Sequence, residues 1–128
     1  MLDHLRKLDI YNVAFELMVH VEKCVRHFER YYKYTTGSEL RSMCSEILAL
    51  TAKFNEKEEA ERAEFLENLK DKIINVQIKL NICEELNVFR RYESWFRAAE
   101  LVTNLLGQCE RLHNYFVDRQ NQGGVRPQ

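Results

Sequence analysis

The sequence predicts an all-α protein, an antiparallel up-and-down four-helix bundle. The chain has 128 residues, a length that fits one domain. It contains only four glycines and one proline, so little in its interior breaks a helix. Apolar residues recur at alternating spacings of three and four, which is the period of a helix with one buried face. Short connections between such segments favour antiparallel neighbours.

The first two helices are expected over residues 9–29 and 37–55. Asp9 is the expected N-cap of the first, and Thr36 with Glu39 forms a capping-box pattern at the start of the second. The apolar stripe of the first helix comprises Ala14, Met18, Val21, Val25 and Phe28, widened by Tyr11, Phe15 and Leu17. The stripe of the second comprises Leu40, Cys44, Ile47, Thr51 and Phe54.

The third and fourth helices are expected over residues 58–86 and 91–118. Acidic residues open the third helix, where they suit the positive end of its dipole. Its stripe comprises Leu66, Leu69, Ile73, Val76, Leu80 and Cys83. That of the fourth comprises Trp95, Ala98, Val102, Leu105, Cys109, Leu112 and Phe116. Gly107 interrupts the fourth helix, and close packing is the expected reason. Residues 1–118 thus form the bundle, and residues 119–128 are expected to be a disordered tail.

The third helix carries a second apolar stripe, formed by Ile74, Ile78 and Ile82 on nearly the opposite face. A helix that is apolar on two faces must bury both, whereas a four-helix bundle buries one. Either a loop or the N-terminal segment covers the three isoleucines, or they form an interface between copies of the chain. The sequence favours the second interpretation and predicts a homo-oligomer.

No recognisable catalytic motif is present, so we expect a protein that is not an enzyme and uses no cofactor. Each helix carries one cysteine, and Cys24, Cys44 and Cys83 lie within about two turns of the same end of the predicted bundle. Cys109 lies about 27 Å down the fourth helix from that end, at 1.5 Å per residue. This distance excludes a zinc site formed by all four thiolates. The cysteines are then either buried apolar residues or, for three of them, ligands of a site shared with His27. We predict buried cysteines and no metal. We expect no membrane partner and a cytoplasmic location, because no secretory signal pattern or membrane-length apolar run occurs.

Basic and aromatic residues gather at one end of the predicted bundle, although the net charge is only −1. Lys33 lies among three tyrosines in the first connection, and Arg41 follows in the second helix. Arg90, Arg91 and Arg97 interleave with aromatic residues near the start of the fourth helix. Such a pattern either contacts phosphates and stacks bases or packs as an amphipathic loop on the bundle end. Arg90 and Arg91 are the best candidates for phosphate contact.

Residues 9–17, 32–40 and 105–108 carry a recognisable pattern within the helices over about residues 9–117. In these residues the sequence resembles the accessory variability determinant family, whose members accompany the reverse transcriptase of diversity-generating retroelements. The most specific part of the resemblance is the segment from Lys33 to Gly37 before the second helix. Where the family's third helix typically carries arginines, this chain has Gln77 and Asn81, with Lys79 as the nearby cation.

The resemblance implies a homopentameric barrel of four-helix bundles that binds a reverse transcriptase and template RNA in support of mutagenic cDNA synthesis. The residues expected to contact the nucleic acid or the enzyme are then Lys33, Arg41, Lys79, Arg90, Arg91 and Arg97. A related group of four-helix bundles, encoded within intervening sequences of ribosomal RNA genes, is the alternative. A scaffold of that type would act in protein–protein interaction without nucleic-acid binding.

Overall fold

The computed structural model describes residues 8–125, and this part of the chain is helical with no β-strand. Four long helices account for most of it: α1 (Asp9–Val25), α3 (Thr36–Lys53), α4 (Glu59–Glu85) and α5 (Tyr92–Val125). A short helix α2 (Arg30–Lys33) lies between α1 and α3, and a 3₁₀ turn η2 (Phe54–Glu56) follows α3. The all-helical prediction is therefore confirmed.

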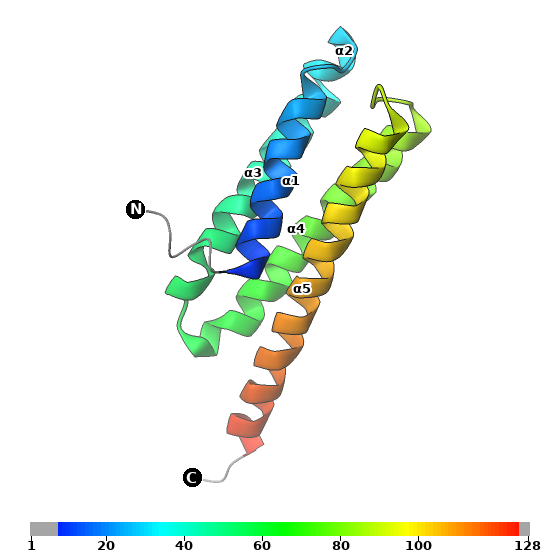
Figure 1. Ribbon diagram of the computed structural model, residues 1–128. Helices are drawn as coiled ribbons and strands as arrows, with labels where there is room; N and C mark the ends of the chain where they lie inside the picture. Colours follow the sequence, from blue (N-terminus) through cyan, green and yellow to red (C-terminus); the bar gives the residue numbers. More distant parts are fainter. Residues whose placement is uncertain (1–7, 126–128) are drawn as a thin grey trace.

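The four long helices pack in a ring, so that each has two neighbours. α1 contacts α3 and α5, and α4 contacts the same two helices (Figure 1). Contacts between α4 and α5 pair residues in reverse order along the chain: Trp95 bonds to Leu80 near one end, and Arg119 pairs with Glu59 near the other. A single core runs through the middle of this ring.

The residues of the predicted stripes make up most of the core. Every stripe residue of α3–η2 and α4 is buried, while Met18, Trp95 and Leu112 in the other two helices are half-buried. Thr51 is the one buried polar side chain among the described residues, and its hydroxyl donates to the Leu48 carbonyl oxygen at 2.7 Å. Its hydrogen-bonding capacity is therefore satisfied inside the helix.

The helix starts differ from the predicted caps. Asp9 is the first residue of α1, and Leu8 occupies the N-cap position without a side-chain bond. Thr35 is the N-cap residue of α3, and its hydroxyl donates backwards to the Tyr31 carbonyl oxygen at 2.7 Å. The Thr36–Glu39 capping box is therefore wrong. The first helix also ends earlier than residue 29, and part of the expected connection is the helix α2.

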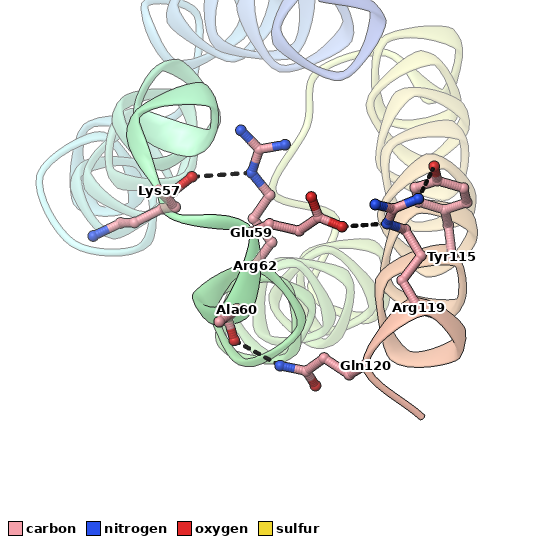
Figure 2. A network of polar contacts seen from close by, with 7 residues as sticks. All are labelled: Lys57, Glu59, Ala60, Arg62, Tyr115, Arg119 and Gln120. Atoms are coloured by element: carbon pink, nitrogen blue, oxygen red, sulfur yellow. Dashed lines mark hydrogen bonds and ion pairs between the residues drawn. The ribbon is translucent and has the colours of Figure 1, made fainter. Parts of the chain in front are cut away.

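The expectation of a disordered tail is wrong for residues 119–125, because α5 continues as helix to Val125. Contacts with the start of α4 stabilise the added turns. The Arg119 guanidinium pairs with the Glu59 carboxylate and donates to the Tyr115 hydroxyl, while the Gln120 amide donates to the Ala60 carbonyl oxygen (Figure 2). Residues 126–128 lie outside the described range. α5 projects past the α3–α4 connection at this end (Figure 1).

Arg62 organises the connection between α3 and α4. Its guanidinium donates to the carbonyl oxygens of Lys57 at 3.1 Å and Asn55 at 3.4 Å. The same group lies 5.0 Å from the centroid of the Phe54 ring and 5.4 Å from that of Phe116. Arg62 thus closes the end of the core that is opposite α2.

Candidate nucleic-acid and partner surfaces

The structure brings the two predicted basic-aromatic segments together at one end of the bundle. Figure 1 shows α2 and the α4–α5 connection at the same end of the molecule. The rings of Phe28 and Phe89 join the two segments, with their centroids 4.9 Å apart and an edge-to-face geometry. This contact joins the α1–α2 connection to the α4–α5 connection.

The α4–α5 turn is held by a pair of helix-ending hydrogen bonds. The Val88 amide donates to the Cys83 carbonyl oxygen at 2.9 Å, and the Asn87 amide donates to that of Glu84 at 3.1 Å. Asn87 has a φ of 55°, the left-handed conformation that this Schellman motif requires. Val88 is buried and anchors the turn. The segment from residue 88 onward therefore leaves α4 in a defined direction.

Three of the predicted contact residues are engaged in ion pairs with neighbouring helices. Arg41 lies 3.0 Å from Glu22, measured from Nε to Oε1. Lys79 donates to the Glu39 carboxylate at 2.8 Å, with a side chain only 25% exposed. Arg97 pairs with Glu16 and lies 3.6 Å from Glu100. Nearby carboxylates offset the fields of these three cations, which weakens their attraction for an external phosphate.

The other three predicted cations have weaker ion pairs, or none with the described residues. Arg91 lies 3.8 Å from Glu93, but both side chains are more than three-quarters exposed, so solvent screens the pair. Within the described residues, no carboxylate lies at ion-pair distance from Arg90 or from the half-buried Lys33. Arg90 lines a cleft of about 330 Å³ beside the α4–α5 turn. The local positive charge is therefore concentrated at this turn.

Exposed aromatic rings accompany these cations. Tyr31 and Tyr34 are 67% and 69% exposed, whereas Tyr32 between them packs against the core. Tyr32 thus packs on the bundle end as the amphipathic-loop interpretation expects, whereas the Tyr31 and Tyr34 rings face solvent. On α5, Tyr92 is 61% exposed and its ring stacks with that of Phe96 at a centroid distance of 6.1 Å. These rings are available for stacking with an external partner.

The second stripe of α4 is open to solvent in a single chain. Ile78 and Ile82 are 52% and 46% exposed, and Ile74 is half-buried. Leu86 extends the stripe by one more step of four residues and is 49% exposed. Leu86 was not among the residues predicted for this interface, although it continues their spacing of four. The N-terminal residues proposed as a cover lie mostly outside the described range, and Leu8 lines a different pocket.

A second apolar surface lies along α1 and the start of α5. Phe15 and Val19 are more than one-third exposed, and Phe15 therefore does not belong to the core stripe that it was expected to widen. Together with His20 and Arg97 they line a groove of about 320 Å³. This surface was missed because its α1 and α5 parts are separated by about 80 residues, as in the Arg97–Glu16 pair.

All four cysteines are buried free thiols. Burial raises the pKa of the Cys44 and Cys109 thiols to about 12 and that of Cys83 to about 11. Burial also raises the pKa of Cys24. Thiolates are the form that binds metals, so this environment opposes metal binding. Within the described residues, no group of three or more candidate ligands is arranged to hold a metal ion.

Comparisons with known proteins return no match, neither to a protein-family model nor to a curated protein. In the part of the chain that the structure describes, no helix has both the length and the apolar character that crossing a membrane requires.

Proposed function

We propose that this chain is a non-catalytic accessory protein of a diversity-generating retroelement. In this function it binds the reverse transcriptase and template RNA in the cytoplasm and supports mutagenic cDNA synthesis. The family resemblance motivates the proposal. The observation that carries it is the gathering of Arg90, Arg91 and exposed aromatic rings at one end of the bundle, where phosphates and bases would be contacted.

The same proposal includes a homopentameric barrel of antiparallel up-and-down bundles. The exposed isoleucine stripe of α4 supports self-association, because Ile78 and Ile82 lie one helical turn apart and about half of each side chain would gain burial in an interface. A second apolar surface, on α1 and α5, includes Phe15 and Val19. Two different surfaces on one chain favour head-to-tail contacts between copies, and such contacts form a ring when the rotation from copy to copy closes. The subunit number of five follows from the resemblance.

A scaffold of the ribosomal intervening-sequence type, acting through protein–protein contacts alone, is the second candidate. The ion pairs of Arg41, Lys79 and Arg97 favour it, because they reduce the positive charge that the surface offers to RNA. The net charge of −1 favours it as well.

The ratio of absorbance at 260 and 280 nm in purified protein distinguishes the two candidates. Retained nucleic acid that is lost at high salt supports the accessory function, because phosphate contacts weaken steeply with ionic strength. Replacing both Arg90 and Arg91 with Glu is then expected to abolish retention while far-ultraviolet circular dichroism stays unchanged. A protein that is free of nucleic acid at low salt, and does not bind added RNA, supports the scaffold instead.

A further inference from the structure

The cleft beside the α4–α5 turn combines aromatic rings with an exposed cation. Its walls are formed by Cys83, Glu84, Asn87, Phe89, Arg90, Tyr92 and Trp95. Three of the seven are aromatic, and one is a cation, Arg90, with no carboxylate of residues 8–125 at ion-pair distance. Its volume of about 330 Å³ lies at the lower end of the range for small-ligand sites, which suits one nucleotide and excludes a duplex.

The aromatic walls of this cleft are held in place before any ligand arrives. The Trp95 indole N–H donates to the Leu80 carbonyl oxygen at 2.7 Å, which fixes the ring against α4. Phe89 is held by the Phe28 ring. The Tyr92 and Trp95 centroids are 5.5 Å apart, so the two rings form adjoining surfaces. A prearranged wall reduces the entropy lost on binding.

The charges of the cleft define which part of a ligand enters. The Glu84 carboxylate on the wall repels an anion inside the cleft, whereas it accepts hydrogen bonds from uncharged N–H groups. Arg90 also lines the cleft, is exposed, and lies next to the exposed Arg91 in the sequence, so the two guanidinium groups provide positive charge for a phosphate. An uncharged ring with N–H groups, attached to a phosphate, matches this distribution.

We infer that this cleft binds one nucleotide of single-stranded RNA, with the base against Tyr92 and Trp95 and its phosphate on Arg90. The inference rests on the proposed RNA-binding function and gives it a defined site. Stacking tolerates different bases, so recognition is of the single strand rather than of a sequence. Adenine, with the larger ring, is expected to bind more tightly than uracil.

Trp95 is the one tryptophan of the chain and therefore reports directly on the cleft. Fluorescence of the full-length protein is titrated with eight-nucleotide oligoadenylate and oligouridylate, and with inorganic phosphate. Binding is measured in parallel by the anisotropy of dye-labelled RNA. We expect both RNAs to change the Trp95 emission, oligoadenylate at the lower concentration. Inorganic phosphate should leave the emission unchanged, because it does not reach the aromatic wall.

Two variants and two matched controls sharpen the test. Tyr92→Ala is expected to weaken RNA binding about tenfold through the loss of one stacked base. Arg90→Gln should lower the slope of log affinity against log salt by about 0.7, the value for one phosphate contact on a single strand. Tyr115→Ala and Arg111→Gln make the same chemical changes away from the cleft and should bind like the wild type. Circular dichroism verifies that each variant folds. Both replaced cleft side chains, Tyr92 and Arg90, are exposed, so we expect their variants to fold like the wild type.

Two results would overturn the inference, and they differ in whether the proposed RNA-binding function is retained. In the first, anisotropy detects RNA binding, but the Trp95 emission does not change and Arg90→Gln binds equally well. The RNA then occupies another surface, and the proposed function is retained. RNA that does not bind at low salt by either measurement removes the cleft and the RNA-binding part of the proposed function together.

Discussion

Gly37 and Gly107 both lie within helices, and the structure predicts opposite effects when each is replaced by alanine. A β-carbon at Gly37 would lie 2.8 Å from Val25 Cγ1, 2.9 Å from the Tyr32 carbonyl oxygen and 3.1 Å from Phe28 Cδ2. These atoms belong to the end of α1, to the segment that follows it and to α2. Gly37 therefore permits the close approach of α3 to this segment, in the part of the sequence that carries the most specific resemblance.

The magnitudes follow from these distances. Overpacking costs about 1–3 kcal/mol, and the upper part of this range applies at Gly37 because a backbone oxygen cannot move aside cheaply. Alanine recovers at most about 1 kcal/mol through its helix propensity, which leaves a net loss of about 2 kcal/mol. At Gly107 the only atom met is the flexible Arg111 Nη1 at 3.4 Å. The expectation of close packing at Gly107 is thus wrong, and Gly107→Ala should stabilise by about 1 kcal/mol.

Thermal unfolding followed by circular dichroism measures both effects at one protein concentration. A change of 1 kcal/mol corresponds to about 4 °C for a chain of this size. Gly37→Ala should therefore unfold about 8 °C below the wild type, and Gly107→Ala about 4 °C above it. Equal, stabilising shifts in both variants would refute the close approach at Gly37.

Three further predictions concern the partner surface, the turn and a buried thiol. Ile78→Glu should keep the fold within about 0.5 kcal/mol, because the side chain is half exposed, yet reduce the mass in light scattering to that of one chain. An unchanged mass would remove the stripe from the interface. Asn87→Val should lower the free energy of unfolding in urea by about 1–2 kcal/mol, because Asn87 has a φ of 55° that a β-branched residue adopts poorly. Asn87→Gly should not lower it, and equal losses in the two variants would contradict the left-handed turn. Burial raises the pKa of the Cys44 thiol from 9.0 to about 12, so its contribution to stability is complete below pH 9 and is lost as the pH rises towards 12. Urea unfolding at pH 8 and pH 10.5 should show a smaller decline in Cys44→Ala than in the wild type, and an equal decline would contradict the shift.

The hydrophobic period predicted the core with few errors, because burial on a helix repeats locally every three or four residues. The stripe from Leu66 to Cys83 is fully buried as expected. The same period also identified the second apolar stripe of α4 from the sequence. Helix content and the residues that face the interior are thus readable without knowledge of the tertiary contacts.

Contacts between distant residues account for what the sequence did not reveal. The helical turns around Arg119 depend on Glu59, which is 60 positions away. The positive charge of Arg97 is offset by Glu16, which is 81 positions away. Arg97 is therefore less available to an external phosphate than its place in a basic-aromatic stretch predicted. No periodicity encodes such pairs. The basic end was predicted in outline, but the distinction between paired and unpaired cations required the structure.

The mass of the purified protein by light scattering after size exclusion is the most direct test of the proposed assembly, on which the accessory function depends. A homopentamer would have a mass of about 77 kDa, five times the 15.3 kDa of one chain. A mass of 15.3 kDa at micromolar concentration would contradict it, because Ile78 and Ile82 would then remain exposed in a stable monomer.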